Sequence, residues 1–141
     1  MAVISNSVDL MVEPGIAFEY LADLRNEMDW NPRVVSMEKL TEGPIGHGTK
    51  FLANWKSAPR PIEVNVTSFD PPHGWVWHNG GPIEVELTIR FEPINGGVRL
   101  HTAFAATPHG LFKLIFPLFL RKLTREEAQN MELIKAKLES L

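Results

Sequence analysis

The stretch PIEVELTIRFEPINGGVRLHTAFA, residues 82–105, decides the fold of this chain. From Ile83 to Phe91, apolar side chains alternate with charged or polar ones, which is the period of a β-strand that covers a core with one face only. The Asn95–Gly96 pair suits a two-residue hairpin turn, and the alternation resumes at Val98. The sequence therefore predicts two antiparallel strands with their apolar faces on the same side.

The turn at Asn95–Gly96 also sets the register of the two strands, because a hairpin turn of known length fixes which residues lie opposite each other. The expected pairs are Phe91 with Leu100, Ile89 with Thr102, and Leu87 with Phe104. In this register His101 lies on the solvent face. We therefore interpret His101 as a surface residue and not as a base.

The rest of the chain supplies further strands and a long helix. A strand over residues 3–12 precedes a short helix over 13–26 and one more helical turn over 27–32. Further strands are expected over residues 33–40, 48–56, 61–69, 74–79, 83–92 and 97–107. Their turn-rich connections favour an antiparallel meander, and the pattern from Pro108 to Leu141 is helical. This order predicts an α+β fold.

The residues GPIGHGTK, numbers 43–50, resemble a phosphate-binding loop, whose pattern is G-x-x-x-x-G-K-[ST]. The glycine spacing fits, but the lysine and the threonine stand in reversed order. A phosphate-binding loop leads into a helix, whereas the residues that follow here alternate as a strand. We therefore interpret the glycines as turn residues, with Gly46 and Gly48 at positive φ.

Length and composition suit a single domain spanning residues 1–141. The formal net charge of −3 offers no general attraction to a phosphate backbone, so we expect no nucleic-acid partner. The chain has no cysteine and no basic signal-peptide start, and we expect a cytoplasmic protein. The most apolar run, residues 111–120, is too short to span a bilayer, so we expect no stable membrane insertion.

Five histidines raise the question of a metal site: His47, His73, His78, His101 and His109. Their spacing contains no helical i,i+4 pair and no HExxH motif, and most of them lie in or beside expected turns. We interpret them as solvated loop residues and expect neither a metal ion nor another cofactor. His78 is the exception, because one register of its strand turns it toward the interior.

Four stretches carry a resemblance to a known family. They are AFEYLADLRNEMDWNPRVVSMEKLTEGPIGHGTKF (17–51), DPPHGWVWH (70–78), IRFEPINGGVRL (89–100) and GLFKLIFPLFLRKLTREEAQNMELIKAKLES (110–140). With the order of elements, the chain resembles the START-like helix-grip superfamily (SRPBCC), and within it the bacterial polyketide cyclase/dehydrase-like branch. The resemblance implies a strongly bent seven-stranded antiparallel sheet wrapped around a long C-terminal helix, with two short helices after the first strand. It also implies an apolar cavity between sheet and helix, but no particular reaction, because the family has no shared catalytic signature.

We expect the ligand-binding residues to come from inward positions of the strands and from the long helix. The candidates are Phe51, Trp55, Trp77, His78, Val85, Leu87, Ile89, Thr102, Phe104, Phe116, Leu120, Glu127 and Met131. The register of the strand before the hairpin stays open. A two-residue turn at Gly80–Gly81 points Val76 and His78 inward, whereas a loop one residue longer points Trp75 and Trp77 inward. We favour the second arrangement, because two exposed tryptophans are unusual outside a contact surface.

Glu127 is the acidic candidate on the long helix, near its apolar stripe, and a buried carboxyl there could act as an acid or a base. The simpler interpretation, which we favour, is that Glu127 reaches solvent or pairs with Arg125 or Lys135. Thr102 is the best inward hydroxyl. No hydroxyl, base and acid fall into a triad, so the sequence names no catalytic residue.

The apolar run over residues 111–120 has three interpretations: core, cavity wall, or a dimer or membrane-surface contact. For function, the first hypothesis is the binding of a hydrophobic small molecule of lipid, isoprenoid or polyketide type, without catalysis. One alternative is a cyclase or dehydratase that acts on a polyketide-type substrate in the same cavity. The second alternative is a protein-partner module, with a homodimer as one form.

Overall fold

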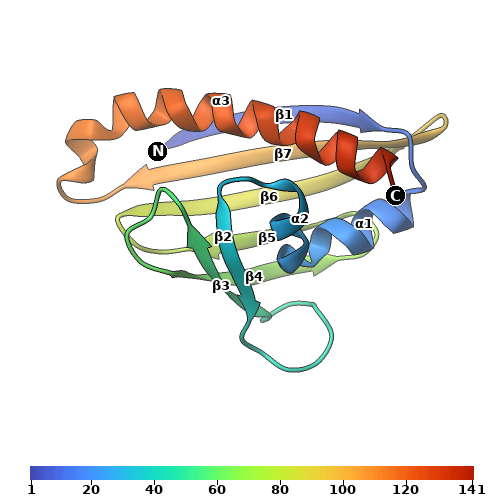
Figure 1. Cartoon of the computed structure of the whole chain (residues 1–141), viewed down its shortest axis with the longest axis horizontal. Helices are drawn as coiled ribbons and strands as arrows, with labels where there is room; N and C mark the ends of the chain where they lie inside the picture. Colours follow the sequence, from blue (N-terminus) through green and yellow to red (C-terminus); the bar gives the residue numbers. More distant parts are fainter.

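The computed structural model describes residues 1–141 as one curved antiparallel sheet with three α-helices and a turn of 3-10 helix (Figure 1). The elements are β1 (Ala2–Leu10), α1 (Pro14–Ala22), η1 (Leu24–Asn26), α2 (Glu27–Trp30), β2 (Val34–Lys39), β3 (Lys50–Trp55), β4 (Ile62–Asp70), β5 (Gly74–Asn79), β6 (Ile83–Ile94), β7 (Gly97–Pro108) and α3 (Phe112–Glu139). The strands are ordered β1-β7-β6-β5-β4-β3-β2 in a seven-stranded sheet. The predicted α+β helix-grip fold is confirmed.

The hairpin of β6 and β7 has the predicted register. Its cross-strand partners include Phe91 with Leu100, Ile89 with Thr102, and Leu87 with Phe104. The turn residue Gly96 has φ +86°, in the left-handed region that glycine adopts without strain. Every second residue of β7 from Val98 to Ala106 is buried, so one face of the hairpin belongs to the interior, and His101 lies on the other face, as expected.

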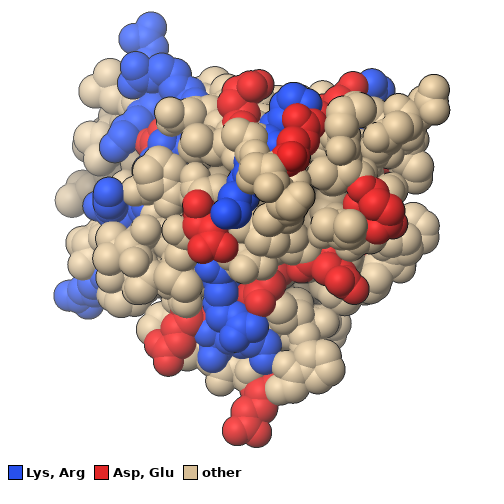
Figure 2. All heavy atoms as spheres, turned by 45° about the vertical axis from the view of Figure 1, so that its right-hand side comes forward, with Lys and Arg blue, Asp and Glu red and all other residues tan.

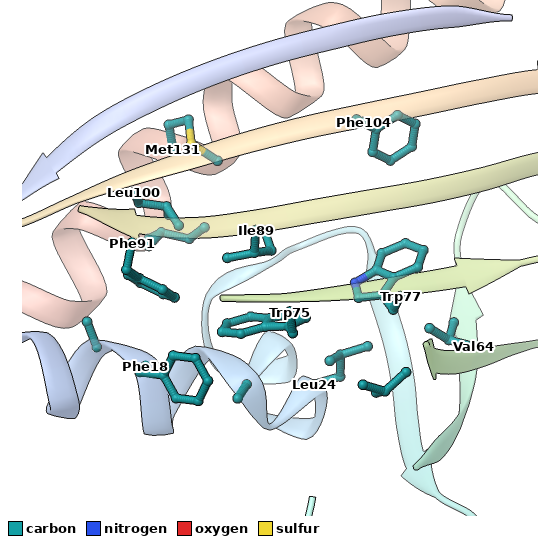
Figure 3. Close-up of a cluster of buried hydrophobic side chains, with 14 of the residues drawn as sticks. Phe18, Leu24, Val64, Trp75, Trp77, Ile89, Phe91, Leu100, Phe104 and Met131 are labelled. Carbon is teal, nitrogen blue, oxygen red and sulfur yellow. The ribbon is translucent and has the colours of Figure 1, made fainter. Parts of the chain in front are cut away.

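Helix α1 is fixed to the sheet through one aromatic side chain. The Glu13 carboxylate accepts hydrogen bonds from the backbone N–H groups of Gly15 and Ile16 at 3.0 and 3.2 Å and so caps the start of α1. Phe18 then packs edge-on against Trp75, with ring centroids 5.1 Å apart. Figure 3 shows Phe18 pointing from α1 toward Trp75 and Phe91. This contact closes one end of the interior.

Helix α3 crosses the inner side of the sheet and lies along β1 (Figure 1). Met131, Ile134 and Leu138 are its buried apolar side chains, and in Figure 3 Met131 points toward the sheet near Leu100. The helix begins later than predicted, at Phe112, because β7 continues to Pro108. No helix of the protein has both the length and the apolar character needed to cross a membrane.

The glycine-rich loop joins β2 to β3, and a strand follows it. This is not the loop-to-helix geometry that binds phosphate. Positive φ occurs at Gly43 and Gly48, +87° and +88°, and not at Gly46, so the prediction for Gly46 is wrong. The backbone N–H of Gly46 instead donates to the Thr49 hydroxyl at 2.9 Å, which closes the loop in an ordinary conformation.

Gly74 of β5 lies where no side chain fits, because a Cβ built there would lie 2.1 Å from the carbonyl oxygen of Ile89. We expect Gly74→Ala to lower the free energy of unfolding by about 1–3 kcal/mol, since β5 and β6 must move apart locally. Gly80→Ala is the matched control, because Gly80 has no atom within 4 Å of that position. Urea denaturation measures both variants, and equal stabilities would contradict this packing.

Candidate ligand-binding cavity

A cavity of about 240 Å³ lies between the inner face of the sheet and α3. Its wall is formed by residues of α1, η1, α2, the strands β3 to β7, and α3, and most of these residues are hydrophobic. The volume is just below the range of roughly 300–1,000 Å³ that is common for small-molecule sites. The cavity is therefore a candidate binding site for a compact apolar molecule.

All four tryptophans of the chain line this cavity. Trp55 and Trp77 stack on each other with ring centroids 6.4 Å apart and an interplanar angle of 27°. Trp75 and Trp77 are each only 5% exposed, so the favoured inward orientation of both is correct. Both tryptophans point inward because the loop between β5 and β6 is longer than a two-residue turn. The last cross-strand pair before this loop is Asn79 with Val85.

His78 lies on the outer face of β5, because its neighbours Trp77 and Asn79 point inward. Its Nε2 lies 2.8 Å from one carboxylate oxygen of Glu84, and Nε2 of His109 lies 3.0 Å from the other. The structure therefore removes His78 from the cavity residues and places it in a surface hydrogen-bond network.

Most of the other candidates do line the cavity. They are Trp55, Trp77, Val85, Leu87, Ile89, Thr102, Phe104, Glu127 and Met131. They come from β3, β5, β6, β7 and α3, so the fold brings together residues that are far apart in the sequence. Their role in binding a ligand stays a prediction.

Three apolar candidates lie elsewhere. Phe51 points inward from β3 as expected, but it is fully buried in close-packed core opposite Val64. Phe116 and Leu120 are partly buried against the core and do not line the cavity. The residues of this part of α3 that do line the cavity are Phe112, Phe119 and Leu123. The sequence could not distinguish them from their neighbours, because the helix is apolar on all sides here.

Polar side chains gather where α2 and β2 meet α3. Arg33 stands at their centre: its Nε lies 2.8 Å from the Glu126 carboxylate, and its Nη1 donates to Gln129 at 2.9 Å. Its Nη2 donates to the Glu126 carbonyl at 3.1 Å and to the Asn130 side chain. We call the cavity-lining members of this group the polar corner. They are Glu27, Asn31, Arg33, Glu126, Glu127 and Asn130.

Glu27 of α2 is a carboxyl that the sequence analysis missed, because a four-residue helix has no period that could show which side faces inward. The pKa of Glu27 is raised to about 8, first by burial and then by the negative charge of Glu127, while a hydrogen bond with Asn31 opposes the shift. Near neutral pH this carboxyl is largely protonated and can donate a hydrogen bond.

Glu127 also lines the cavity. The interpretation favoured from the sequence, that Glu127 reaches solvent or pairs with Arg125 or Lys135, was therefore wrong. Lys135 instead pairs with Glu139 at 2.7 Å, and Arg125 is exposed. The pKa of Glu127 is raised to about 7, because the effect of burial is larger than the opposing effects of the Asn130 hydrogen bond and the Arg33 charge. The negative charge of Glu127 acts on Glu27, so the titration of one carboxyl affects that of the other. The polar corner can therefore both donate and accept a proton at neutral pH.

The remaining groups limit what the site can do. Thr102 is buried on the cavity wall. No group of three or more His, Asp or Glu side chains is arranged to hold a metal ion. Oδ1 of Asn79, another wall residue that is 2% exposed, has no hydrogen-bond partner. The cavity thus combines a large apolar wall with a few hydrogen-bonding groups.

This protein has a curved antiparallel sheet, a long C-terminal helix that closes the sheet, and an apolar cavity between them. These features define a helix-grip protein of the START type. A family model described as "Polyketide cyclase / dehydrase and lipid transport" matches residues 1–139. The chain belongs to this family. No curated protein sequence matches it significantly.

Solved structures share the fold at low sequence identity. TTHA0849 from Thermus thermophilus is 12% identical with a TM-score of 0.81, over 99% of this chain and 98% of that one. A START superfamily protein from Mycobacterium smegmatis is 11% identical with a TM-score of 0.77, over 98% and 97%. The di-domain ARO/CYC protein BexL, from the BE-7585A biosynthetic pathway, is 12% identical with a TM-score of 0.74, over 98% of this chain and 50% of that one.

The raised pKa values make stability depend on pH. Between the ordinary carboxyl pKa of 4.5 and about 8, the folded state holds more protons at Glu27 than the unfolded state does. The free energy of unfolding therefore falls as pH rises through this window. Glu27→Gln removes the titrating group and keeps its shape. We expect this variant to be more stable than wild type by about 1–3 kcal/mol near pH 8, and to differ little near pH 5.

Urea denaturation at the two pH values measures this difference. Glu19→Gln is the control, because Glu19 is an exposed residue of the neighbouring helix α1. A Glu27→Gln variant that loses as much stability as wild type between the two pH values would show that Glu27 does not titrate as described.

Proposed function

We propose that this chain binds a hydrophobic small molecule, of lipid, isoprenoid or polyketide type, in the cavity between the sheet and α3. One observation carries the proposal: a mostly apolar cavity is lined by every tryptophan of the chain and has most of its polar residues gathered in the polar corner. Burial of apolar surface, worth about 25 cal/mol per Å², would supply most of the affinity. The polar corner would fix the orientation of the ligand.

The hydrogen-bonding groups support a ligand that carries a hydroxyl or carbonyl group. The protonated Glu27 can donate to a carbonyl, and the pair of Glu27 and Glu127 can accept from a hydroxyl. Oδ1 of Asn79 is a buried acceptor without a partner, and a ligand hydroxyl would relieve the cost of about 1–3 kcal/mol that such a group carries. The family description, which names both polyketides and lipids, is consistent with this chemistry.

Leu87 offers the sharpest test of binding, because it lies on the cavity wall at the inward position of β6. Leu87→Trp should fill ligand space and keep the fold, since a cavity accepts volume that a packed core rejects. We expect the variant to bind a fluorescent fatty-chain probe at least about 10-fold more weakly, with its free energy of unfolding nearly unchanged.

Glu86→Trp is the matched control, because Glu86 is the adjacent, exposed residue on the other face of the same strand. It should leave probe affinity at the wild-type value. Strong destabilisation by Leu87→Trp, without loss of binding, would place Leu87 in tight core. If no fatty probe of any chain length binds wild type, the proposal fails.

A cyclase or dehydratase is the second candidate function, and the polar corner favours it specifically. A carboxyl with its pKa near neutral inside an apolar cavity is suited to general acid–base catalysis. Glu127, with its pKa raised to about 7, would move a proton on a polyketide-type substrate held against the tryptophans. Proton transfer of this kind needs no nucleophilic side chain.

Mass spectrometry of the co-purified ligand separates the two functions. Wild type and Glu127→Gln would be purified from the protein's own host and the bound molecules compared. A binding protein should carry the same molecule in both, with lower occupancy in the variant because a hydrogen bond is lost. A molecule in Glu127→Gln alone that is heavier by one water, or that is an uncyclised isomer of equal mass with a different fragmentation pattern, would show that the chain is an enzyme.

A further inference from the structure

The first half of α3 presents an apolar face that no other part of the chain covers. Leu111, Leu114 and Leu118 are 82%, 79% and 73% exposed, and Ile115 is 53% exposed. These positions are three or four residues apart, so along the start of α3 they share one face. Contiguous exposed apolar surface of this kind marks a contact site in a folded protein.

The same face becomes basic along the next two turns. Arg121, Lys122 and Arg125 continue the spacing and are exposed, and Lys113 lies beside the apolar residues. Residues 111–125 contain no acidic side chain, although the chain as a whole has a net charge of −3. The start of α3 lies at the left side of Figure 1, and Figure 2 shows Lys and Arg side chains along the left edge of the turned molecule.

This segment is also part of the cavity wall. Phe112, Phe119 and Leu123 line the cavity, and their helical positions lie beside the exposed apolar face, next to Ile115. The same turns of α3 therefore carry both the exposed face and part of the cavity wall.

We propose that the exposed face of α3, from Leu111 to Arg125, docks on the surface of an anionic lipid bilayer. The apolar side chains of the first turns enter the boundary between headgroups and acyl chains, as in amphipathic helices that lie in the membrane interface. The basic side chains of the following turns meet the anionic headgroups, and long Lys and Arg side chains can reach them while their stems stay in apolar surroundings. The proposal does not depend on the proposed ligand.

Charge complementarity selects the bilayer over a second copy of the chain. In a two-fold symmetric dimer the same patch lies on both sides of the contact. Neither copy of residues 111–125 would then bring an acidic side chain to Arg121 and Arg125 of the other, and Lys122 has only Glu126 of its own helix, 3.9 Å away. A negatively charged lipid surface has the opposite sign over the whole patch.

Vesicle co-sedimentation of the full chain tests the proposal. The probes are vesicles of phosphatidylcholine alone and of phosphatidylcholine with about 30 mol % phosphatidylglycerol. We expect binding to the anionic vesicles at about 0.1 M salt, at least about 10-fold weaker binding to neutral vesicles, and a steep loss near 1 M salt, where the Debye length shrinks to about 3 Å. Equal binding to both vesicle types, or none, overturns the proposal.

Two variants assign the contact to α3. Leu114→Glu combined with Leu118→Glu should abolish vesicle binding and leave the unfolding transition unchanged, because both side chains are exposed. Ile16→Glu is the matched control, since Ile16 is an exposed apolar residue of another helix, α1, and is 51% exposed. It should bind vesicles like wild type.

Sedimentation equilibrium decides between the bilayer and a second copy. We expect wild type to be monomeric in the absence of lipid. A wild-type dimer that the double variant dissociates would make this face a dimer contact and overturn the proposal. Vesicle binding that persists in the double variant would overturn it as well.

Discussion

The pairing of β6 with β7 is the interaction on which the rest of the structure depends. It is the longest contact of two strands in the sheet, from Ile83 with Pro108 to Ile94 with Gly97. Because side chains alternate along a strand, this single register decides which residues of both strands face inward. β5 pairs with the free edge of β6 and β1 with that of β7, so the inward faces of both neighbours follow from the same hairpin.

A second constraint comes from the polar corner, where the fold keeps the carboxyls of Glu27 and Glu127 half-buried at the edge of an apolar cavity. Burial disfavours their ionised forms, and the charge of Arg33 offsets only part of this cost at Glu127. Packing alone would favour apolar residues at Glu27 and Glu127. Residues that lower stability and line a cavity are candidates for a functional role, since strained or destabilised groups persist where function needs them.

The sequence was sufficient for the fold and for much of the cavity wall, because both follow from period two and from turn chemistry. The alternation around Leu87 and the Asn95–Gly96 turn determined the register of the central hairpin. The sequence was insufficient for Glu27 and Glu127, because their burial is decided by how α2 meets α3, a contact between segments about a hundred residues apart that no local period records. His78 stayed among the candidates because the register of its strand was open: the length of the loop after Asn79 sets its face, and glycine-rich loops do not reveal their length.

The central claim is that the cavity exists to hold a hydrophobic ligand. The most direct measurement is a crystal structure of the chain purified from its own host, with attention to the electron density between Trp55, Trp77 and Glu127. The account predicts continuous density for an apolar molecule against the stacked tryptophans, with a polar atom within hydrogen-bond distance of Glu27 or Glu127. A cavity filled by its own side chains, or occupied by water alone under all purification conditions, would contradict it.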